Sequence, residues 1–330
     1  MCFEGAKIVI SFRFQKLKFH NPFSDLILVV EFIFFLNIKK IPIFVPYLHY
    51  ITVLFMRNLI LIFIGLHVCI DELPAQSFEE FVEKSFEYAA ANDLVSAEVA
   101  LKSAMRLEPA NRLNYALLFN LGTYQRRQKK YDDALFSYSA ALHQMPHNVS
   151  FLLNRAELLT EMGETEKAIG DYNVLLDRTP THEEARFQRG LLYIHTGDYL
   201  MAEADFEYII KTHENTFLGR FGYAILEKVR GNYDDSEVIF LYLADKYPNN
   251  IRLLEERAEL YFLTKRFTRA TSDLNKVFAA TPEPSAELYM LRGRLKLAQY
   301  ERESAAIDFR KARDLGYDPV TVERLLKECF

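Results

Sequence analysis

Cysteine is scarce in this chain of 330 residues. Cys2 and Cys69 lie in a hydrophobic N-terminal stretch, and Cys329 stands alone at the other end. Residues 78–330 therefore hold a single thiol, and no disulfide is expected within them. A segment of this length can bury a continuous core, so it can be stable without cross-links even outside a reducing compartment.

Motifs for catalysis and cofactor binding are also missing. The sequence has no P-loop, no G-x-G-x-x-G turn, no G-x-S-x-G elbow and no C-x-x-C pair. The eight histidines are scattered, and His143 and His147 straddle Pro146 without a third or fourth metal ligand. We therefore expect no enzyme, no cofactor, no metal site and no small-molecule substrate.

The part of the chain after residue 77 has no excess of positive charge. It carries 33 Lys and Arg against 40 Asp and Glu, a net charge of −7. Nucleic-acid-binding domains usually present a basic surface, so nucleic acid is not an expected partner. The short basic run at 126–130 is interpreted as a solvated helix end and turn.

From position 97 onward the residues repeat with a nearly constant period. A small residue returns every 34 to 37 positions, at Ala97, Ala134, Ala168, Ala202, Ser236, Ala270 and Ala305. Four positions later comes a large apolar residue, at Leu101, Tyr138, Tyr172, Phe206, Phe240, Leu274 and Phe309. A spacing of four places both residues on one face of a helix. Most units have a further small residue twelve positions earlier, and many have a proline twelve positions later.

This pattern predicts a two-helix unit that is closed by a helix-stopping residue. With these residues in place, positions 78–318 resemble the tetratricopeptide repeat in seven tandem copies. The resemblance implies an all-α fold, a right-handed superhelical solenoid of stacked antiparallel helix pairs. Between the two helices stand Asn92, Gly163, Gly197 and Gly231, which tolerate a left-handed backbone, whereas three other units have Lys129, Lys265 and Tyr300 there.

Residues 319–330 are predicted to form a C-terminal capping helix. Asp318 and Pro319 provide an N-cap and a first turn, and an apolar stripe follows at Val322, Leu325, Leu326 and Cys329. A solenoid with an open end would expose an apolar face, so a final amphipathic helix is expected. Cys329 lies on this stripe and is expected to be a core residue.

The first 77 residues are hydrophobic and do not show the repeat. Met56, Arg57 and Asn58 precede an apolar run at 59–70, and Ala75-Gln76-Ser77 resembles a small-x-small cleavage site. We therefore expect a signal peptide at 56–77 and an exported protein, periplasmic or secreted. The apolar run is shorter than the roughly 20 residues that a membrane span needs.

Residues 1–55 allow two interpretations. If Met56 is the biological start, they are upstream sequence from a gene-model error and have no function. Alternatively, 26–38 and 41–70 are membrane segments and the protein is membrane-anchored. Charged residues and prolines interrupt both runs, at a cost in hydrocarbon.

The resemblance also implies which residues face a partner. In this family the first helix of each unit lines a concave groove, and the inward positions fall here on Phe119, Asn120, Thr123, Leu153, Asn154, Glu157, Phe187, Gln188, Leu191, Phe221, Ile225, Glu255, Glu256 and Glu259. The groove is thus expected to be apolar at its centre and acidic toward its C-terminal side. The clamp with which some members bind a C-terminal carboxylate is expected to be absent, because only Asn120 and Asn154 match it.

Two interpretations of Phe119, Phe187 and Phe221 remain open. They are anchors for an apolar peptide whose flanking basic residues meet the glutamates, or they pack against neighbouring first helices. The expected function is a scaffold or adaptor that binds a protein or peptide in the groove, outside the cytoplasm. The alternative is a membrane-anchored subunit of an envelope-associated complex, if the N-terminal segment is retained. An enzyme built on the solenoid would need a site, and none is visible.

Overall fold

The computed structural model describes residues 77–213 and 216–330. The chain divides into two units, Met1–Ala75 and Gln76–Phe330, and the described residues belong to the second. The expected upstream segment at 1–55 and the expected signal peptide at 56–77, apart from Ser77, lie outside the described residues. None of the helices that are described is long and apolar enough to cross a membrane.

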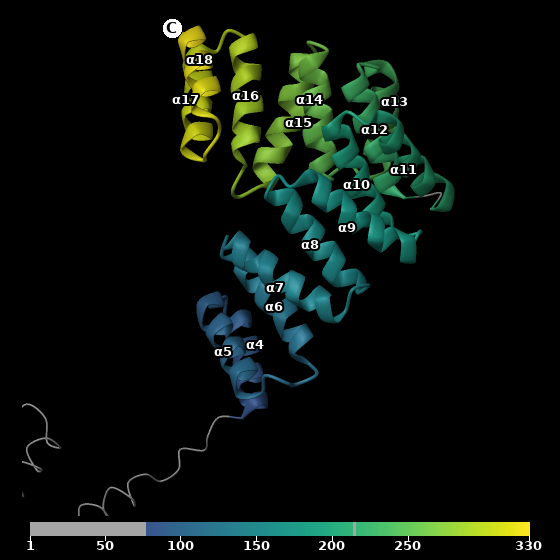
Figure 1. Ribbon diagram of the computed structural model, residues 1–330. Coiled ribbons are helices and arrows are strands. Elements are labelled where there is room, and N and C mark those ends of the chain that lie inside the picture. Colours follow the sequence, from purple (N-terminus) through teal and green to yellow (C-terminus); the bar gives the residue numbers. More distant parts are fainter. Residues whose placement is uncertain (1–76, 214–215) are drawn as a thin grey trace, which may run out of the picture. The chain divides into compact units, whose positions relative to one another are not determined.

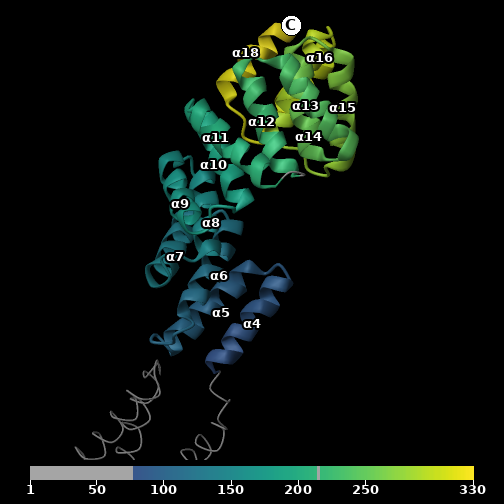
Figure 2. The same ribbon diagram turned by 90° about the vertical axis from the view of Figure 1, so that its right-hand side faces the viewer.

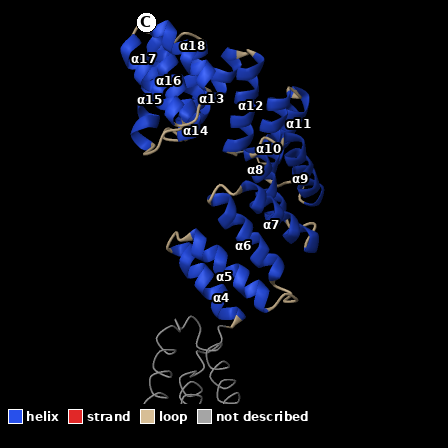
Figure 3. Ribbon diagram, turned by 60° about the vertical axis from the view of Figure 1, so that its left-hand side comes forward, coloured by secondary structure: helices blue, strands red, loops and turns tan. Residues whose placement is uncertain are grey.

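The described residues contain fifteen α-helices and no strand (Figures 1 and 3). In chain order the helices are α4 (Phe78–Ala90), α5 (Leu94–Leu107), α6 (Asn114–Arg127), α7 (Tyr131–Gln144), α8 (Val149–Glu161), α9 (Thr165–Arg178), α10 (Glu183–Thr196), α11 (Tyr199–Thr212), α12 (Phe217–Arg230), α13 (Tyr233–Lys246), α14 (Ile251–Leu263), α15 (Phe267–Ala280), α16 (Ala286–Ala298), α17 (Arg302–Asp314) and α18 (Pro319–Cys329). The all-α fold class predicted from the sequence is confirmed.

Consecutive helices form antiparallel pairs, from α4 with α5 to α16 with α17 (Figures 1 and 2). Each pair packs against the next pair along the chain, and α18 packs against α17. The even-numbered helices α4 to α16 are called first helices below, and the odd-numbered helices α5 to α17 second helices. This is the solenoid of stacked helix pairs that the repeat predicts.

A small residue at the same position of every second helix makes the stacking close. These residues are fully buried: Ala97, Ala134, Ala168, Ala202, Ser236, Ala270 and Ala305. The large side chain one turn later packs against a small residue of the first helix of its own pair. A β-carbon on Gly122 would overlap the ring of Tyr138, and one on Gly293 would overlap the ring of Phe309. The period of the sequence is therefore the period of the packing.

The turns inside the pairs have one backbone geometry with or without glycine. Gly163, Gly197 and Gly231 have positive φ angles, as predicted. Asn92, Lys129, Lys265 and Tyr300 have positive φ angles as well, between 59° and 67°. Because this conformation is unfavourable for residues with a side chain, the packing of the two helices must impose it.

The predicted capping helix is α18, and its first turn is capped as expected. The Asp318 side chain accepts hydrogen bonds from the backbone N–H groups of Val320 and Thr321. Val322 and Cys329 are buried in the cluster that contains Phe309. Cys329 is thus a core residue, and burial raises the pKa of its thiol.

Candidate partner-binding face

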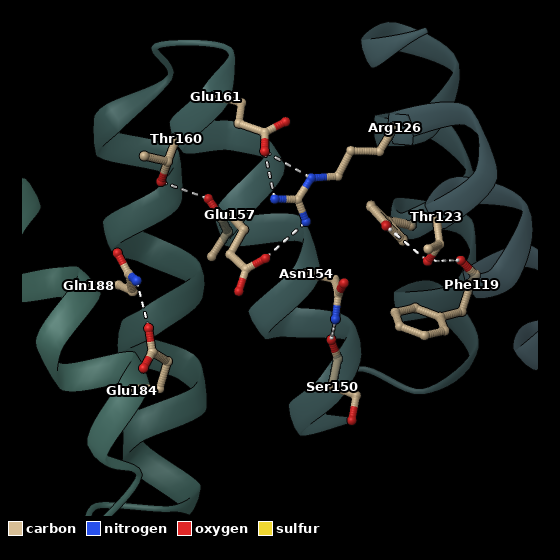
Figure 4. Close-up of polar contacts among 12 residues, drawn as sticks. Phe119, Thr123, Arg126, Ser150, Asn154, Glu157, Thr160, Glu161, Glu184 and Gln188 are labelled. Atoms are coloured by element: carbon tan, nitrogen blue, oxygen red, sulfur yellow. Dashed lines mark hydrogen bonds and ion pairs between the residues drawn. The ribbon is translucent and has the colours of Figure 1, made fainter. Parts of the chain in front are cut away.

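The residues expected to face a partner lie on five successive first helices, α6, α8, α10, α12 and α14. The surface that their side chains form is called the first-helix face below. Its contacts run from one first helix to the next and show which side chains are free to meet a partner. Figure 4 shows the part of this face on α6, α8 and α10.

At α6 the aromatic and hydroxyl side chains are engaged inside the protein. The ring of Phe119 stacks on Phe151 at 4.6 Å and lies 5.6 Å from Tyr138. The hydroxyl oxygens of Thr123 and Tyr138 are 3.1 Å apart. Phe119 is half-buried, so its packing against α8 fits the second interpretation made from the sequence. Asn120 on the same helix is also half-buried.

Arg126 joins α6 to two glutamates of α8 (Figure 4). Its guanidinium donates to Glu157 at 2.9 Å and to Glu161 at 2.7 Å. Burial opposes this charge, but the hydrogen bonds to Glu161 and Glu157 outweigh it and raise the pKa of Arg126. Arg126 is therefore not the solvated helix end that its basic neighbourhood indicated in the sequence.

Polar side chains continue along α8 and α10. Asn154 donates to the Ser150 carbonyl, and Gln188 donates to Glu184 at 2.6 Å (Figure 4). Burial and the charges of Glu157 and Glu184 raise the pKa of Tyr172. Two carboxylates, one from each helix, thus act on the same buried hydroxyl. Leu153 and Leu191 are half-buried and pack against the core clusters beneath.

Phe187 and Phe221 are core residues and do not line a surface. Their side chains are 0% and 1% exposed, and the two rings stack at 6.1 Å. Ile225 is also buried. The guanidinium carbon of Arg252, on α14, lies 5.1 Å from the centroid of the Phe187 ring, so a cation packs against this ring. Of the two interpretations of Phe187 and Phe221, packing inside the protein is the one that their burial supports. The ring of Phe206 lies against Phe187, and the ring of Phe240 lies against Phe221.

A buried lysine of α12 meets the glutamates of α14. The ammonium group of Lys228 contacts both Glu256 and Glu259. Burial disfavours its charge, but the two carboxylates outweigh that effect and raise the pKa of Lys228. Burial and the charge of Glu256 raise the pKa of Glu255. The acidic residues predicted toward the C-terminal side are thus together, and two of them already have a cation.

One recurring pair was missed in the sequence. An arginine of the first helix binds the carboxylate of an aspartate in its second helix, in four pairs: Arg155 with Asp171, Arg189 with Asp205, Arg257 with Asp273 and Arg292 with Asp308. The signal is regular, because each arginine directly precedes the small residue of its first helix and each aspartate lies three positions after the small residue of its second helix. These pairs hold the two helices together.

The comparison with known proteins agrees with the period and the packing. A tetratricopeptide repeat family model matches residues 125–186. A crystal structure of a tetratricopeptide repeat protein from Parabacteroides merdae is 54% identical and has a TM-score of 0.70, covering 77% of this chain and 99% of that one. The chain belongs to the tetratricopeptide repeat family. Tetratricopeptide repeat proteins generally mediate contacts between proteins, and their fold is in general not that of an enzyme.

A more distant solved structure shares the fold alone, and one further protein matches part of the chain in sequence. The APC/C hetero-tetramer Cut9–Hcn1 is 13% identical, with a TM-score of 0.56 over 80% of this chain and 57% of that one. The peptidyl-prolyl cis-trans isomerase PASTICCINO1 of Arabidopsis thaliana is 29% identical over 107 residues. The match covers 30% of this chain and 17% of that isomerase.

Within residues 77–213 and 216–330, no group of three or more His, Cys, Asp or Glu side chains is placed to hold a metal ion.

Proposed function

We propose that this protein is an adaptor whose first-helix face binds a basic segment of a partner protein. The observation that carries the proposal is the charge of this face. Six carboxylates lie on this face in two groups, Glu157, Glu161 and Glu184 on α8 and α10, and Glu255, Glu256 and Glu259 on α14. Three cations accompany them, at Arg126, Lys228 and Arg252. The buried phenylalanines support an electrostatic surface in place of the apolar one that the sequence favoured.

The carboxylates keep room for a partner's cations. The side chains of Glu161 and Glu259 are 42% and 45% exposed although each is ion-paired. A carboxylate has about four acceptor positions, so one internal cation does not saturate it. An exposed ion pair contributes only about 0.2–1 kcal/mol, so several must act together. We expect association that is steered by charge and that weakens as salt concentration rises.

The proposal is tested by neutralising three carboxylates of this face. None of the three is the sole ion-pair partner of a cation in the described part of the chain. In the triple variant Glu157→Gln, Glu184→Gln and Glu255→Gln, Arg126 keeps Glu161 and Lys228 keeps both of its partners. The matched control is Glu166→Gln, Glu287→Gln and Glu303→Gln, which removes the same charge from exposed positions. Recovery of crosslinked partners should fall for the first variant alone. Equal recovery from both variants would refute the choice of surface.

We also propose that the adaptor acts outside the cytoplasm after removal of residues 56–77 as a signal peptide. The apolar run at 59–70 and the small residues at 75–77 support this proposal. The alternative is a membrane-anchored subunit of an envelope-associated complex, which the hydrophobic runs at 26–38 and 41–70 favour. N-terminal sequencing of the protein from its source separates the two, because a start near Phe78 removes any anchor.

A further inference from the structure

The first pair of the stack has an apolar groove between α4 and α5, called the α4–α5 groove below. Its volume is about 280 Å³, and its lining includes Phe81, Lys84, Tyr88, Val95, Val99 and Ser103. The side chains of Val95 and Val99 are 60% and 56% exposed. The end unit of a solenoid usually presents a polar outer face, whereas adjoining exposed apolar side chains mark an interaction site.

In every later pair a helix lies at the corresponding place. The second helix of the preceding pair packs against the first helix, as α5 packs against α6 and α11 against α12. Tyr88 shows the difference at α4, because its side chain is 40% exposed, whereas those of Gln125, Leu159 and Tyr261 are 3–4% exposed. All four residues lie three positions after the small residue of their first helix. The α4–α5 groove therefore continues the interface of the stack and is the place where a further helix would join it.

Lys84 lacks the bond that its counterparts make. The residue directly before the small residue of a first helix donates to the preceding second helix in three pairs, from Arg155 to Ser139 at 3.1 Å, from Arg189 to Asn173 at 2.6 Å and from Tyr223 to Glu203 at 3.3 Å. Lys84 holds this position in α4. In the described part of the chain its ammonium group has no hydrogen bond, ion pair or ring contact. A cationic donor is thus free in the α4–α5 groove.

The charge of the groove is positive. Lys84 is the one charged side chain among its lining residues. Arg106 lies further along α5, and its guanidinium donates to the neutral hydroxyl of Ser103 at 3.0 Å. Within residues 77–213 and 216–330, neither cation has a carboxylate partner. An acidic side chain of an incoming helix therefore meets opposite charge here without displacing an ion pair.

We propose that the α4–α5 groove binds an amphipathic helix of a partner protein. The apolar stripe of that helix packs on Tyr88, Val95 and Val99, and an acidic side chain at its edge meets Lys84. The partner helix takes the place of a preceding second helix, so the stack gains one helix. The groove shares no residue with the first-helix face, so the two surfaces can be occupied independently.

A second copy of the chain fits this groove less well. A two-fold axis through the groove would bring Lys84 toward the Lys84 of the other copy, and like charges repel. Head-to-tail stacking of copies would need a free second helix at the other end of the array. That end is closed, because α18 packs against α17.

A designed helical probe tests the preference. It is a fluorescein-labelled, stapled peptide of 14 residues, the length of α5, with leucines at i, i+3, i+4 and i+7 and glutamates beside them. Its counterpart has lysine in place of each glutamate. With the full chain, fluorescence polarisation should show binding of the acidic probe that weakens as salt concentration rises. Absence of that binding, or equal affinity for the two probes, would overturn the proposal.

Two substitutions locate the probe in the groove. Lys84→Glu changes a side chain without internal bonds and should reverse the preference between the probes. Val99→Asp should lower affinity for the acidic probe roughly tenfold or more, since it places an unpaired charge against the apolar stripe. Unchanged affinity in both variants would contradict the assignment.

The repeat supplies the matched control. Val238 holds the position of Val99 on α13 and is 67% exposed, so Val238→Asp should leave the affinity for the probe unchanged. The triple variant of the first-helix face should also bind the probe as the parent does. Failure of this proposal is thereby distinguished from failure of the proposed adaptor function.

A photocrosslinker at Val95 identifies the natural occupant. p-Benzoylphenylalanine is incorporated there in the full chain, and the crosslinked peptides are sequenced by mass spectrometry. A segment of another protein that has apolar residues at helical spacing and an acidic residue beside them supports the proposal. Crosslinks to a second copy or to the N-terminal segment of the same chain would overturn it, as would recovery no higher than from the same label at Val238.

Discussion

The ammonium nitrogen of Lys228 lies 2.6 Å from a carboxylate oxygen of Glu256, although the lysine side chain is only 6% exposed. The bond joins the first helices of two successive pairs, and Glu259 contacts the same ammonium group. The two partners differ in their access to water, because the Glu256 and Glu259 side chains are 30% and 45% exposed. Only the lysine depends on the pair to keep its charge.

Removing the carboxylates should therefore cost more than removing the ammonium group. Glu256→Gln with Glu259→Gln strands a buried cation and should lower the free energy of unfolding by about 2–4 kcal/mol. Lys228→Met leaves two carboxylates that water can reach, and it should cost about 1 kcal/mol. Urea denaturation measures both. Equal losses would show that the lysine is better hydrated than the structure indicates.

Close packing around Phe206 predicts that a methyl group added at either of two glycines destabilises the protein. A β-carbon on Gly190 or Gly222 would overlap the Phe206 ring. Gly222→Ala should cost about 1–3 kcal/mol through overpacking, in spite of the better helix propensity of alanine. Thermal and urea denaturation provide the measurement, and Phe206→Leu should restore part of the loss in the double variant.

Gly170 on α9 is the matched control for that substitution. A β-carbon there would meet nothing within 4 Å. Gly170→Ala should therefore stabilise the protein by roughly 0.5–1 kcal/mol, the gain expected in a helix. A loss of stability at this position would mean that backbone effects, and not contact with the Phe206 ring, govern the glycines.

A glycine in the turn before α17 should stabilise the protein. Tyr300 has a φ of 67° and its side chain is 85% exposed, so it has an unfavourable backbone conformation and little packing to lose. Tyr300→Gly should raise the free energy of unfolding by about 1 kcal/mol. Gly197→Ala at the equivalent turn should lower it by a similar amount, since φ there is 82°. Chemical denaturation of both variants checks the opposite signs.

The ionisation of Glu98 should make the free energy of unfolding depend on pH in the acidic range. Burial disfavours its charge, but hydrogen bonds from Lys102, Lys130, Gln125 and Gln128 outweigh it and lower the pKa of Glu98 from 4.5 to about 2. The folded protein thus holds the ionised form more tightly than the unfolded chain does. The contribution is complete above about pH 4.5 and is lost as pH falls toward 2, by up to about 3 kcal/mol.

The variant Glu98→Gln isolates this contribution. It should be less stable than the parent at pH 7, and the difference should shrink as pH falls from 4.5 toward 2. Melting temperatures measured across this range provide the test. A difference that stays constant with pH would assign the loss to the hydrogen bonds that an amide cannot accept at this site, and not to the charge.

The spacing of small and large residues predicted the helix pairs and their register, because a period of about 34 residues leaves one repeated packing geometry. The turn residues Gly163, Gly197 and Gly231 were predicted for the same local reason. Whether the rings of Phe187 and Phe221 are exposed to a partner or buried in the core was not predictable in this way. Whether a ring at a groove position is covered depends on how closely two first helices approach, and that distance is set by side chains from other pairs.

The sequence by itself determined the fold and the repeating core, since both follow from which residues are small, large or turn-forming at fixed intervals. Only the tertiary structure decided which charges meet. Lys228 and Glu256 are 28 residues apart in the sequence, and nothing local pairs them. Electrostatic partners and cavities depend on distances between helices, and a sequence period does not specify those distances.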